Sequence, residues 1–418
     1  MSVFPALVFA LTILSQPVPD PVGRMLSADG SFLHRTPGKP TYEAVKKDAL
    51  ITPDDRLIAL PGASVASANG AVTLTSRTDY DGKSPFPILE TAITLHPPGT
   101  NDLDITLDRG RVDLTNFKPS GSAKVRVQFY SQDWTITLDE PNSRVAIEVI
   151  SRWPAGSPFR KTPMEGHEPA MAAVLVVVSR GVSVSDGKTT LALSAPPGPS
   201  LVEWASTGEA RLIAQRLETV PAWADPIAEL RPTATAAREA AEAFRKRVAS
   251  GSVTDAIDAF LASNSIAEKH VGLIAAGALD DLPRLNNAVA TTHDQELWDF
   301  GVSVCCHWLG RNAAQETTLY QFLMDARKFT ATEAEITLQL LHGFTVEDQQ
   351  QPETYEVLIA YLRSPRPAVR NLAAWHLHRL APAGKTIPFR PNATEVEAQT
   401  AYNAWKKLIP TGQIPVMK

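Results

Sequence analysis

Three places in the sequence bring together side chains that can ligate metal ions. Histidine nitrogens, cysteine thiolates and carboxylate oxygens bind zinc, and a site needs three or four of them to converge on one point. The three places are His167-Glu168, Cys305-Cys306-His307 and the pair His376 and His378. Their spacing decides whether such a site can form.

The two motifs that contain only histidine and glutamate do not have the spacing of a metal site. Pro169 follows His167-Glu168 and no second histidine lies four residues further on, so we interpret this motif as part of a loop. His376 and His378 are about half a helical turn apart, which directs their rings to opposite faces. His376 falls within an apolar helix face, so we expect a hydrogen-bonded core histidine there. The other members of that face are Val369, Leu372, Ala373 and Leu380.

The Cys-Cys-His motif fails the same test. Consecutive helix residues diverge by about 100°, so Cys305, Cys306 and His307 cannot converge on one ion. Cys305 shares a helix face with apolar residues, which predicts a thiol in the core. That face comprises Leu297, Phe300, Gly301, Val304 and Trp308. The chain has only these two cysteines, which neither require nor exclude an oxidising compartment. We therefore predict no metal site and no cofactor site.

A row of aspartates follows one predicted strand. Asp102, Asp104, Asp108 and Asp113 could bind calcium or supply the carboxylate pair of a glycoside hydrolase. Alternating residues of a strand lie about 7 Å apart, which overlaps the separation found in inverting hydrolases. No pattern in the neighbouring sequence predicts an apolar pocket that would raise the pKa of one of these aspartates. We therefore expect these aspartates to form the solvated face of the strand.

The tryptophans of the first half suggest a second kind of surface. Trp134, Trp153, Trp204 and Trp223 could line a carbohydrate site. Packing in a core or at a domain junction is the simpler interpretation, because large aromatic rings supply much of the apolar area that proteins bury. The sequence contains no Gly-rich phosphate loop and no Gly-x-Ser-x-Gly, His-Glu-x-x-His or Cys-x-x-Cys motif. We therefore predict no catalytic residue.

Composition narrows the classes of partner. The chain has 418 residues, of which 44% are hydrophobic and 20% charged, as expected for two or three folded domains. Its formal net charge is -5, and its acidic and basic residues are intermixed. Without a basic patch, the sequence gives no support for binding to nucleic acid or to anionic membranes.

The N-terminal residues indicate a location. Val3–Leu14 is an apolar run of 12 residues, followed by the polar, Pro-rich segment Ser15–Pro21. The run has the length of a signal-peptide core and is too short to span a bilayer. We therefore expect residues 1–21 to be a signal peptide and spacer, and the protein to lie in the periplasm or cell envelope. No Lys or Arg precedes the run, as it would in a typical signal peptide. The alternatives are a misassigned start or a buried first segment, and either would place the protein in the cytoplasm.

The character of the sequence changes near residue 230. Of the 33 prolines, 24 lie at or before Pro232. Before this point, short segments that alternate apolar and polar residues lie between Pro and Gly turns, which predicts an antiparallel β domain over residues 30–226. We expect strands at 56–60, 72–74, 88–95, 102–108, 124–129, 134–138, 144–150, 173–179 and 189–193, with a hairpin at Asn69-Gly70 and a turn at Gly110. Eight or more such strands favour a sandwich or jelly-roll.

Several of these strands resemble a known family. Their order and pattern are similar to those of the extracytoplasmic β domain of bacterial FecR-like proteins. The segments that carry the resemblance are Arg56–Gly62, Leu107–Leu114, Lys124–Phe129, Trp134–Leu138 and Arg144–Val149. The resemblance implies an envelope interaction domain and no catalytic residues. Well-known members add a cytoplasmic anti-sigma tail and one membrane helix, neither of which we expect here.

After about Thr235 the apolar residues recur at helical spacing, which predicts about eight helices in an all-α domain over residues 235–410. Four capping boxes mark helix starts, at Ser265, Thr292, Thr330 and Thr394; Pro352 and Pro365 suit first turns, and Gly251, Gly310 and Gly343 suit helix ends. Tyr355–Arg363 and Pro367–Leu380 form an expected antiparallel pair that resembles a HEAT-like repeat. An irregular α-solenoid is therefore our prediction, with a compact bundle as the alternative.

Together these features predict an α+β protein of two domains, a FecR-like β-sandwich or jelly-roll joined through Trp223–Arg231 to a HEAT-like solenoid or bundle. The function they favour is that of a non-enzymatic bacterial envelope protein that binds a protein or glycan partner, in signalling or surface organisation. One alternative is a carbohydrate-active or other hydrolase with an inter-domain site, tested by mutating Asp104 or Asp108. The other is a cytoplasmic α-solenoid scaffold.

Overall fold

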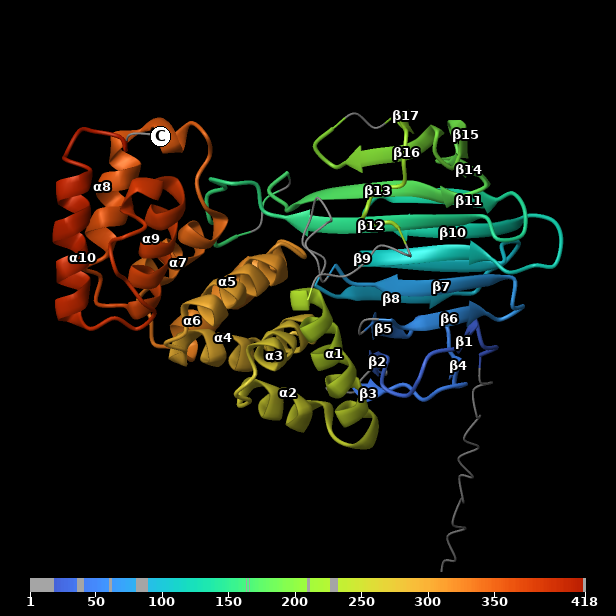
Figure 1. Ribbon diagram of the computed structural model, residues 1–418, viewed down its shortest axis with the longest axis horizontal. Helices are drawn as coiled ribbons and strands as arrows, with labels where there is room; N and C mark the ends of the chain where they lie inside the picture. Colours follow the sequence, from blue (N-terminus) through green and yellow to red (C-terminus); the bar gives the residue numbers. More distant parts are fainter. Residues whose placement is uncertain are drawn as a thin grey trace, which may run out of the picture.

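In the computed structural model, every described strand precedes every described helix (Figure 1). The structure describes residues 19–35, 41–59, 62–79, 89–162, 164, 166–208, 211–225 and 232–415. The chain is therefore an α+β protein, as predicted. The apolar run Val3–Leu14 and residues 226–231 of the expected junction lie outside the described residues. Below, the β region is the part up to Asp225 and the helical region is the part from Pro232.

The β region is one mixed sheet with two halves that share a strand. Its strands are β1 (Gly23–Met25), β2 (Phe32–Arg35), β3 (Glu43–Ala44), β4 (Leu50–Ile51), β5 (Arg56–Ala59), β6 (Ser64–Ser67), β7 (Val72–Arg77), β8 (Thr91–His96), β9 (Leu103–Asn116), β10 (Ala123–Phe129), β11 (Gln132–Leu138), β12 (Arg144–Arg152), β13 (Ala170–Ser179), β14 (Gly181–Ser185), β15 (Thr190–Ser194), β16 (Gly198–Ala205) and β17 (Ala214–Leu217). One half has the order β4-β1-β6-β7-β9-β12-β13-β16-β17. The other has the order β3-β2-β5-β8-β9-β10-β11-β14-β15. Only the β9–β10 pairing among these is parallel.

Gly110 lies in the middle of β9, where we had expected a turn. Residues 103–109 of β9 pair with β8 and β10, whereas residues 110–116 pair with β7 and β12. The prediction that Gly110 ends the strand is therefore wrong, because the strand bends there and passes from one half of the sheet to the other. Gly110 has a φ of +97°, and a Cβ atom built on it would lie 2.4 Å from the carbonyl oxygen of Glu90. Glycine is required at this bend.

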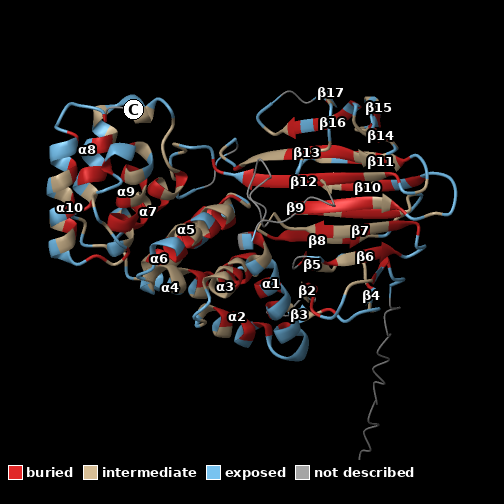
Figure 2. Ribbon diagram, viewed as in Figure 1, coloured by how far each residue is buried: buried red, intermediate tan, exposed pale blue. Residues whose placement is uncertain are grey.

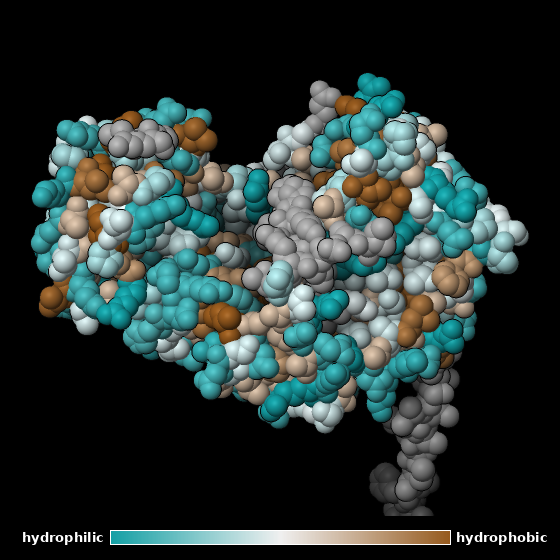
Figure 3. All heavy atoms as spheres, viewed as in Figure 1, coloured by the Kyte–Doolittle hydropathy of each residue, from teal (hydrophilic) through white to brown (hydrophobic). Residues whose placement is uncertain are grey.

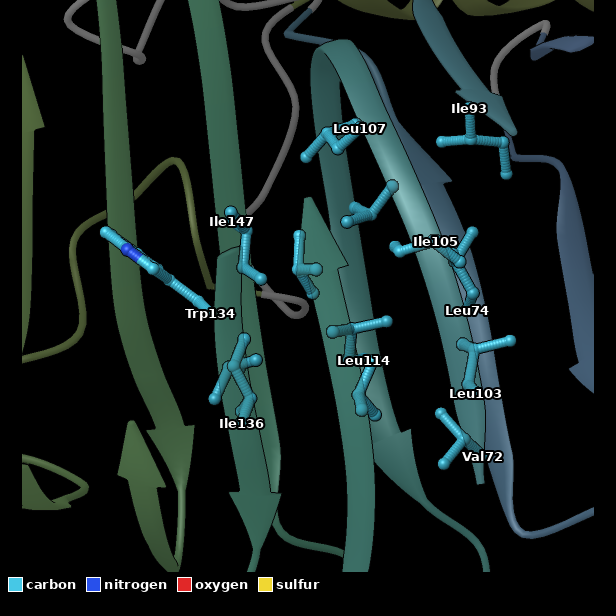
Figure 4. Packing of buried hydrophobic residues seen from close by; sticks show 14 of the residues in the cluster. Val72, Leu74, Ile93, Leu103, Ile105, Leu107, Leu114, Trp134, Ile136 and Ile147 are labelled. Carbon is cyan, nitrogen blue, oxygen red and sulfur yellow. The ribbon is translucent and has the colours of Figure 1, made fainter. Parts of the chain in front are cut away.

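The two halves enclose a single hydrophobic core (Figure 4). Leu103, Ile105 and Leu107 from the first part of β9 pack in the same cluster as Val112 and Leu114 from its second part. These residues are at most 2% exposed. The alternation predicted for residues 102–108 is confirmed, since the leucines and the isoleucine point into the core.

Other local predictions for the strands are also confirmed. Asn69-Gly70 connects β6 to β7 in an antiparallel hairpin, and Gly70 has the positive φ, +70°, that such turns need. The apolar run of β13 lies between β12 and β16, and Ala173–Val177 is buried. A strand that is covered on both faces needs apolar side chains on both sides, so its sequence is a continuous apolar run.

The helical region contains ten α-helices among the described residues, two more than predicted. They are α1 (Pro232–Ser250), α2 (Val253–Leu261), α3 (Ile266–Ala278), α4 (Leu282–Thr291), α5 (Gln295–Leu309), α6 (Ala314–Asp325), α7 (Ala331–His342), α8 (Pro352–Tyr361), α9 (Pro367–Leu380) and α10 (Glu395–Leu408). The expected helix pair corresponds to α8 and α9. None of the helices that the structure describes is both long enough and apolar enough to cross a membrane.

The predicted helix boundaries hold at most positions. Thr330 and Thr394 form complete capping boxes, and Ser265 accepts a hydrogen bond from the backbone N–H of Glu268. Pro352 begins α8, and the three predicted glycines lie at or directly after helix ends. Two predictions are wrong. Asp294, not Thr292, caps α5, because α4 extends through Thr291. Pro365 is not in a first turn, whereas the predicted helix Pro367–Leu380 is confirmed with these bounds as α9.

Helices α1 to α3 cover the outer face of β2, β5 and β8. Leu33, Ile58 and Ala92 point away from the β core and pack in one cluster with Phe244 of α1 and Ile257 of α2. Figure 2 shows buried positions continuing from the sheet into α3 and α5. Burial of apolar area stabilises the contact by roughly 25 cal/mol per Å². The two regions are therefore joined by a hydrophobic interface.

We predict that Gly110→Ala destabilises the protein by at least about 2 kcal/mol, because the methyl group clashes with backbone as well as disfavouring the positive φ. The measurement is equilibrium unfolding in denaturant. The matched control is Gly121→Ala, since Gly121 has a φ of +79° but a methyl group added there would meet no atom within 4 Å. We expect the control to lose only about 1 kcal/mol. Equal losses in the two variants would contradict the role of Gly110 as a close-packed bend.

Candidate binding site in the helical region

A cavity of about 410 Å³ lies between α4, α5, α6, α7 and the start of α9. Its walls are mainly apolar, and Trp298 and Trp308 contribute two aromatic rings from α5. Aliphatic side chains from the other helices complete the walls, among them Leu282, Val289, Leu319, Leu323 and Leu372. This size is within the range of small-molecule sites in proteins.

The cavity lies where separate hydrophobic clusters meet. Trp298 and Leu372 belong to the cluster around α8 and α9, whereas Trp308 and Leu323 belong to the cluster around α6 and α7. Cys305 packs against the cluster of α1 to α5. Exposed residues at the edge of the cavity, Ala326 and Pro367, mark where it reaches the surface.

Two asparagines of the cavity lining have side-chain oxygens without a hydrogen-bond partner among the described residues. The Oδ1 atoms of Asn286 and Asn371 are buried and have no hydrogen-bond partner among the described residues. Asn371 is only 5% exposed. An unpaired buried polar atom costs about 1 to 3 kcal/mol, so native proteins rarely tolerate one unless it has a use. These amides add polar groups to a mainly apolar lining.

Two arginines also line the cavity, and they differ in their partners. Arg366 donates to the carbonyl of Lys328 at 2.6 Å, pairs with Glu333 at 2.8 Å and lies over the ring of Phe329. For Arg327, which is half-buried, no side-chain hydrogen bond or ion pair occurs within the described part of the chain. None of the described residues lining the cavity is Asp or Glu. The cavity wall therefore carries an uncompensated positive charge.

The three residues of the Cys-Cys-His motif point to three different surroundings. Cys305 lines the cavity, Cys306 lies 3.5 Å from the carbonyl oxygen of Leu341, and the His307 ring lies 3.3 Å from Glu90. The prediction that they do not converge is confirmed, and so is the packing of Cys305 against a core. Burial raises the pKa of both thiols, that of Cys306 to about 12. Neither thiol is therefore an activated nucleophile.

The predictions for the second histidine motif are confirmed. His376 is 6% exposed, and its Nε2 lies 2.7 Å from the carbonyl oxygen of Leu340. Burial lowers the pKa of His376 to about 4, so the ring is neutral at pH 7. His378 instead contacts the carbonyl oxygen of Ile387, at 3.1 Å.

The aspartate row is paired with cations. Asp102 contacts Lys118, Asp104 contacts Arg126, Asp108 contacts Arg56, and Asp113 contacts both Arg77 and Arg144. Asp104 and Asp113 are only 4% and 3% exposed. The expectation of a fully solvated face is therefore wrong for these two, because long arginine side chains from neighbouring strands cover them.

The four tryptophans pack within the protein. Trp134 is fully buried against Phe129, and Trp204 contacts the same ring. Trp153 donates from its Nε1 to the carbonyl of Leu309 at 3.2 Å and so joins the two regions. Trp223 lies over the guanidinium of Arg111, which donates to the Trp223 carbonyl. Core and junction packing, which we predicted, is confirmed for these rings.

His167 lies in a loop, as predicted, but it has neighbours that the sequence did not indicate. Its Nε2 lies 3.7 Å from Glu316 of α6, and the Nε2 of His342 lies 2.9 Å from the same carboxylate. Both imidazole rings lie against Trp153. In the parts of the chain described, no group of three His, Cys, Asp or Glu side chains has the arrangement of a metal site. The cluster instead ties the β12–β13 connection to α6 and α7.

A buried charge cluster also joins the β region to the helical region. Glu90, next to the start of β8, is 2% exposed and accepts hydrogen bonds from Arg109 and Arg311, each at 2.6 Å. His307 of α5 lies 3.3 Å from the same oxygen. Burial by itself raises the pKa of Glu90, but the charges of His307, Arg311 and Arg109 outweigh it and hold that pKa well below its ordinary value. Arg311 also reaches Asp280 at 3.0 Å.

Comparison of the chain with known protein families, with curated proteins and with solved structures finds no match.

We predict that Glu90→Gln destabilises the protein by about 3 kcal/mol at pH 7, because it removes the counter-charge of the buried Arg109 and one of the two carboxylate partners of Arg311. Denaturant unfolding measures the loss. Since the folded pKa of Glu90 is lowered, its stabilisation is complete above about pH 4.5 and is lost as the pH falls toward the folded value. The difference in the free energy of unfolding between the variant and the wild type should therefore become smaller at low pH.

The matched control for this prediction is Glu218→Gln. Glu218 pairs with Arg216 at the surface, and the two side chains are 75% and 69% exposed. We expect this control to change stability by less than about 0.5 kcal/mol. A Glu90→Gln variant as stable as the control would contradict the importance of the buried cluster.

Proposed function

We propose that the chain is a non-enzymatic binding protein of the bacterial cell envelope, and that it binds an apolar group of its partner in the cavity of the helical region. The single observation that carries this proposal is the cavity itself, with apolar walls and two unpartnered amides. A FecR-like β-sandwich and a HEAT-like helical region are the architecture that we propose for it. The bent sheet around one core and the paired helices α8 and α9 are consistent with that architecture.

The chemical groups around the cavity favour binding over catalysis. They include amides, guanidinium groups, the hydroxyl of Thr337 and the thiol of Cys305, whose raised pKa makes it a poor nucleophile at neutral pH. The four aspartates considered for hydrolysis are neutralised by ion pairs in the β region. A general acid of a hydrolase lies in an apolar setting, whereas each of these carboxylates lies beside a lysine or arginine side chain.

One face of the outer surface offers less for an apolar partner than the cavity does. On the face seen in Figure 3, hydrophobic residues are scattered among hydrophilic ones. Scattered apolar residues are normal for a protein surface and need no partner. The cavity, in contrast, brings two tryptophan rings and several aliphatic side chains together around one space.

The test is binding of N-phenyl-1-naphthylamine, a neutral dye that fluoresces in apolar surroundings. We expect the wild type to bind it and Ala326→Trp, which places a large ring at the exposed edge of the cavity, to bind it at least about tenfold more weakly. The matched control is Ala314→Trp, at the other end of α6 and outside the cavity lining. A dye that does not bind, or that binds equally to both variants, would overturn the proposal.

The proposed location has its own test. Fractionation of native cells, followed by mass spectrometry of the mature N-terminus, should find a start near Gln16 in an extracytoplasmic fraction. A protein with an intact Met1 in the cytosolic fraction would contradict the proposed location in the cell envelope.

A further inference from the structure

Arg327 is the charged group of the cavity that lacks a counter-charge. It follows α6 in the connection to α7 and is half-buried. The second arginine of the lining, Arg366, already has Glu333 and the Lys328 carbonyl as partners. Within the described residues, Arg327 has no ion pair of its own. A guanidinium without an ion pair can bind an anion beside it through charge-assisted hydrogen bonds.

The charge balance of the lining limits the ligand to about one negative charge. Apart from the two arginines, the polar lining side chains are neutral: Asn286, Asn371, Asn392, Thr337 and the protonated Cys305. A single guanidinium matches a single carboxylate, which it can bind through two parallel N–H···O bonds. A head group with two charges would leave one of them without a partner.

The volume of the cavity limits the size of the apolar part of the ligand. A protein cavity of about 150 Å³ holds one benzene molecule, so 410 Å³ corresponds to roughly 16 non-hydrogen atoms. The apolar walls exclude a polyol of that size, because its hydroxyl groups would lose their hydrogen bonds with water. An aliphatic chain of about ten carbons with a terminal carboxylate meets both limits.

From these observations we infer that the cavity binds a monocarboxylate with an apolar tail, whose carboxylate pairs with Arg327. This inference rests on the proposed function, since it names the chemical class of the group that enters the cavity. It assigns Arg327 as the residue that selects an anionic head group over a neutral one.

The experiment is displacement of bound N-phenyl-1-naphthylamine by decanoate, decanol and decyl phosphate, each below its critical micelle concentration. We expect decanoate to displace the dye at a concentration about tenfold lower than decanol, since the two differ only in the head group. In Arg327→Gln this difference should disappear while the dye still binds. The matched control is Lys328→Gln, which removes the same charge at a neighbouring exposed side chain outside the lining and should keep the difference.

The outcomes separate the inference from the proposed function. If decanol and decanoate displace the dye equally well, or decyl phosphate does so better than decanoate, the monocarboxylate inference is overturned and the proposed function stands. If the dye does not bind to the wild type, the proposed function itself fails. Because Arg327 makes no side-chain bond within the described chain, Arg327→Gln should unfold at the wild-type temperature. A preference for decanoate that persists in this variant would also overturn the role of Arg327.

Discussion

The buried carboxylate of Glu90 is the interaction on which the arrangement of the two regions depends. A carboxylate removed from water is stable only when cations and hydrogen bonds replace its hydration. Here Arg109 comes from β9, whereas His307 and Arg311 come from α5 and the residues after it. The carbonyl of Glu90 also lies against Gly110, where β9 bends between the halves of the sheet. One residue thus connects the bend of the sheet to the docking of the helices.

Helix α5 connects the charge cluster around Glu90 to the cavity. His307 faces the sheet through Glu90, while Trp298, Cys305 and Trp308 of the same helix line the cavity. Trp308 also donates from its Nε1 to Asp280, which accepts from Arg311 of the charge cluster. Contacts with the charge cluster therefore fix the position of α5, which forms one wall of the cavity. A β region that supports the shape of a helical site gives a physical reason for the two regions to share one chain.

Local features of this structure could be predicted from the sequence, whereas long-range ones could not. The alternation of Leu103, Ile105 and Leu107, and the capping boxes at Thr330 and Thr394, depend on residues within a few positions of each other. The bend at Gly110 depends on the backbone of a different strand, so periodicity alone suggested a turn. Asp104 and Asp113 become buried because arginines from other strands cover them. The cavity needs five helices between residues 282 and 392, and no spacing in the sequence signals a volume that their side chains leave unfilled.

Hydrogen exchange of Glu90→Gln, compared with the wild type, tests most directly whether the charge cluster holds α5 against the sheet. We expect amides of α5 and β8 to exchange faster together in this variant, while those of α10, which lies far from β8 in Figure 1, keep their wild-type rates. Unchanged exchange in α5, with faster exchange confined to β8, would contradict the central role of the cluster.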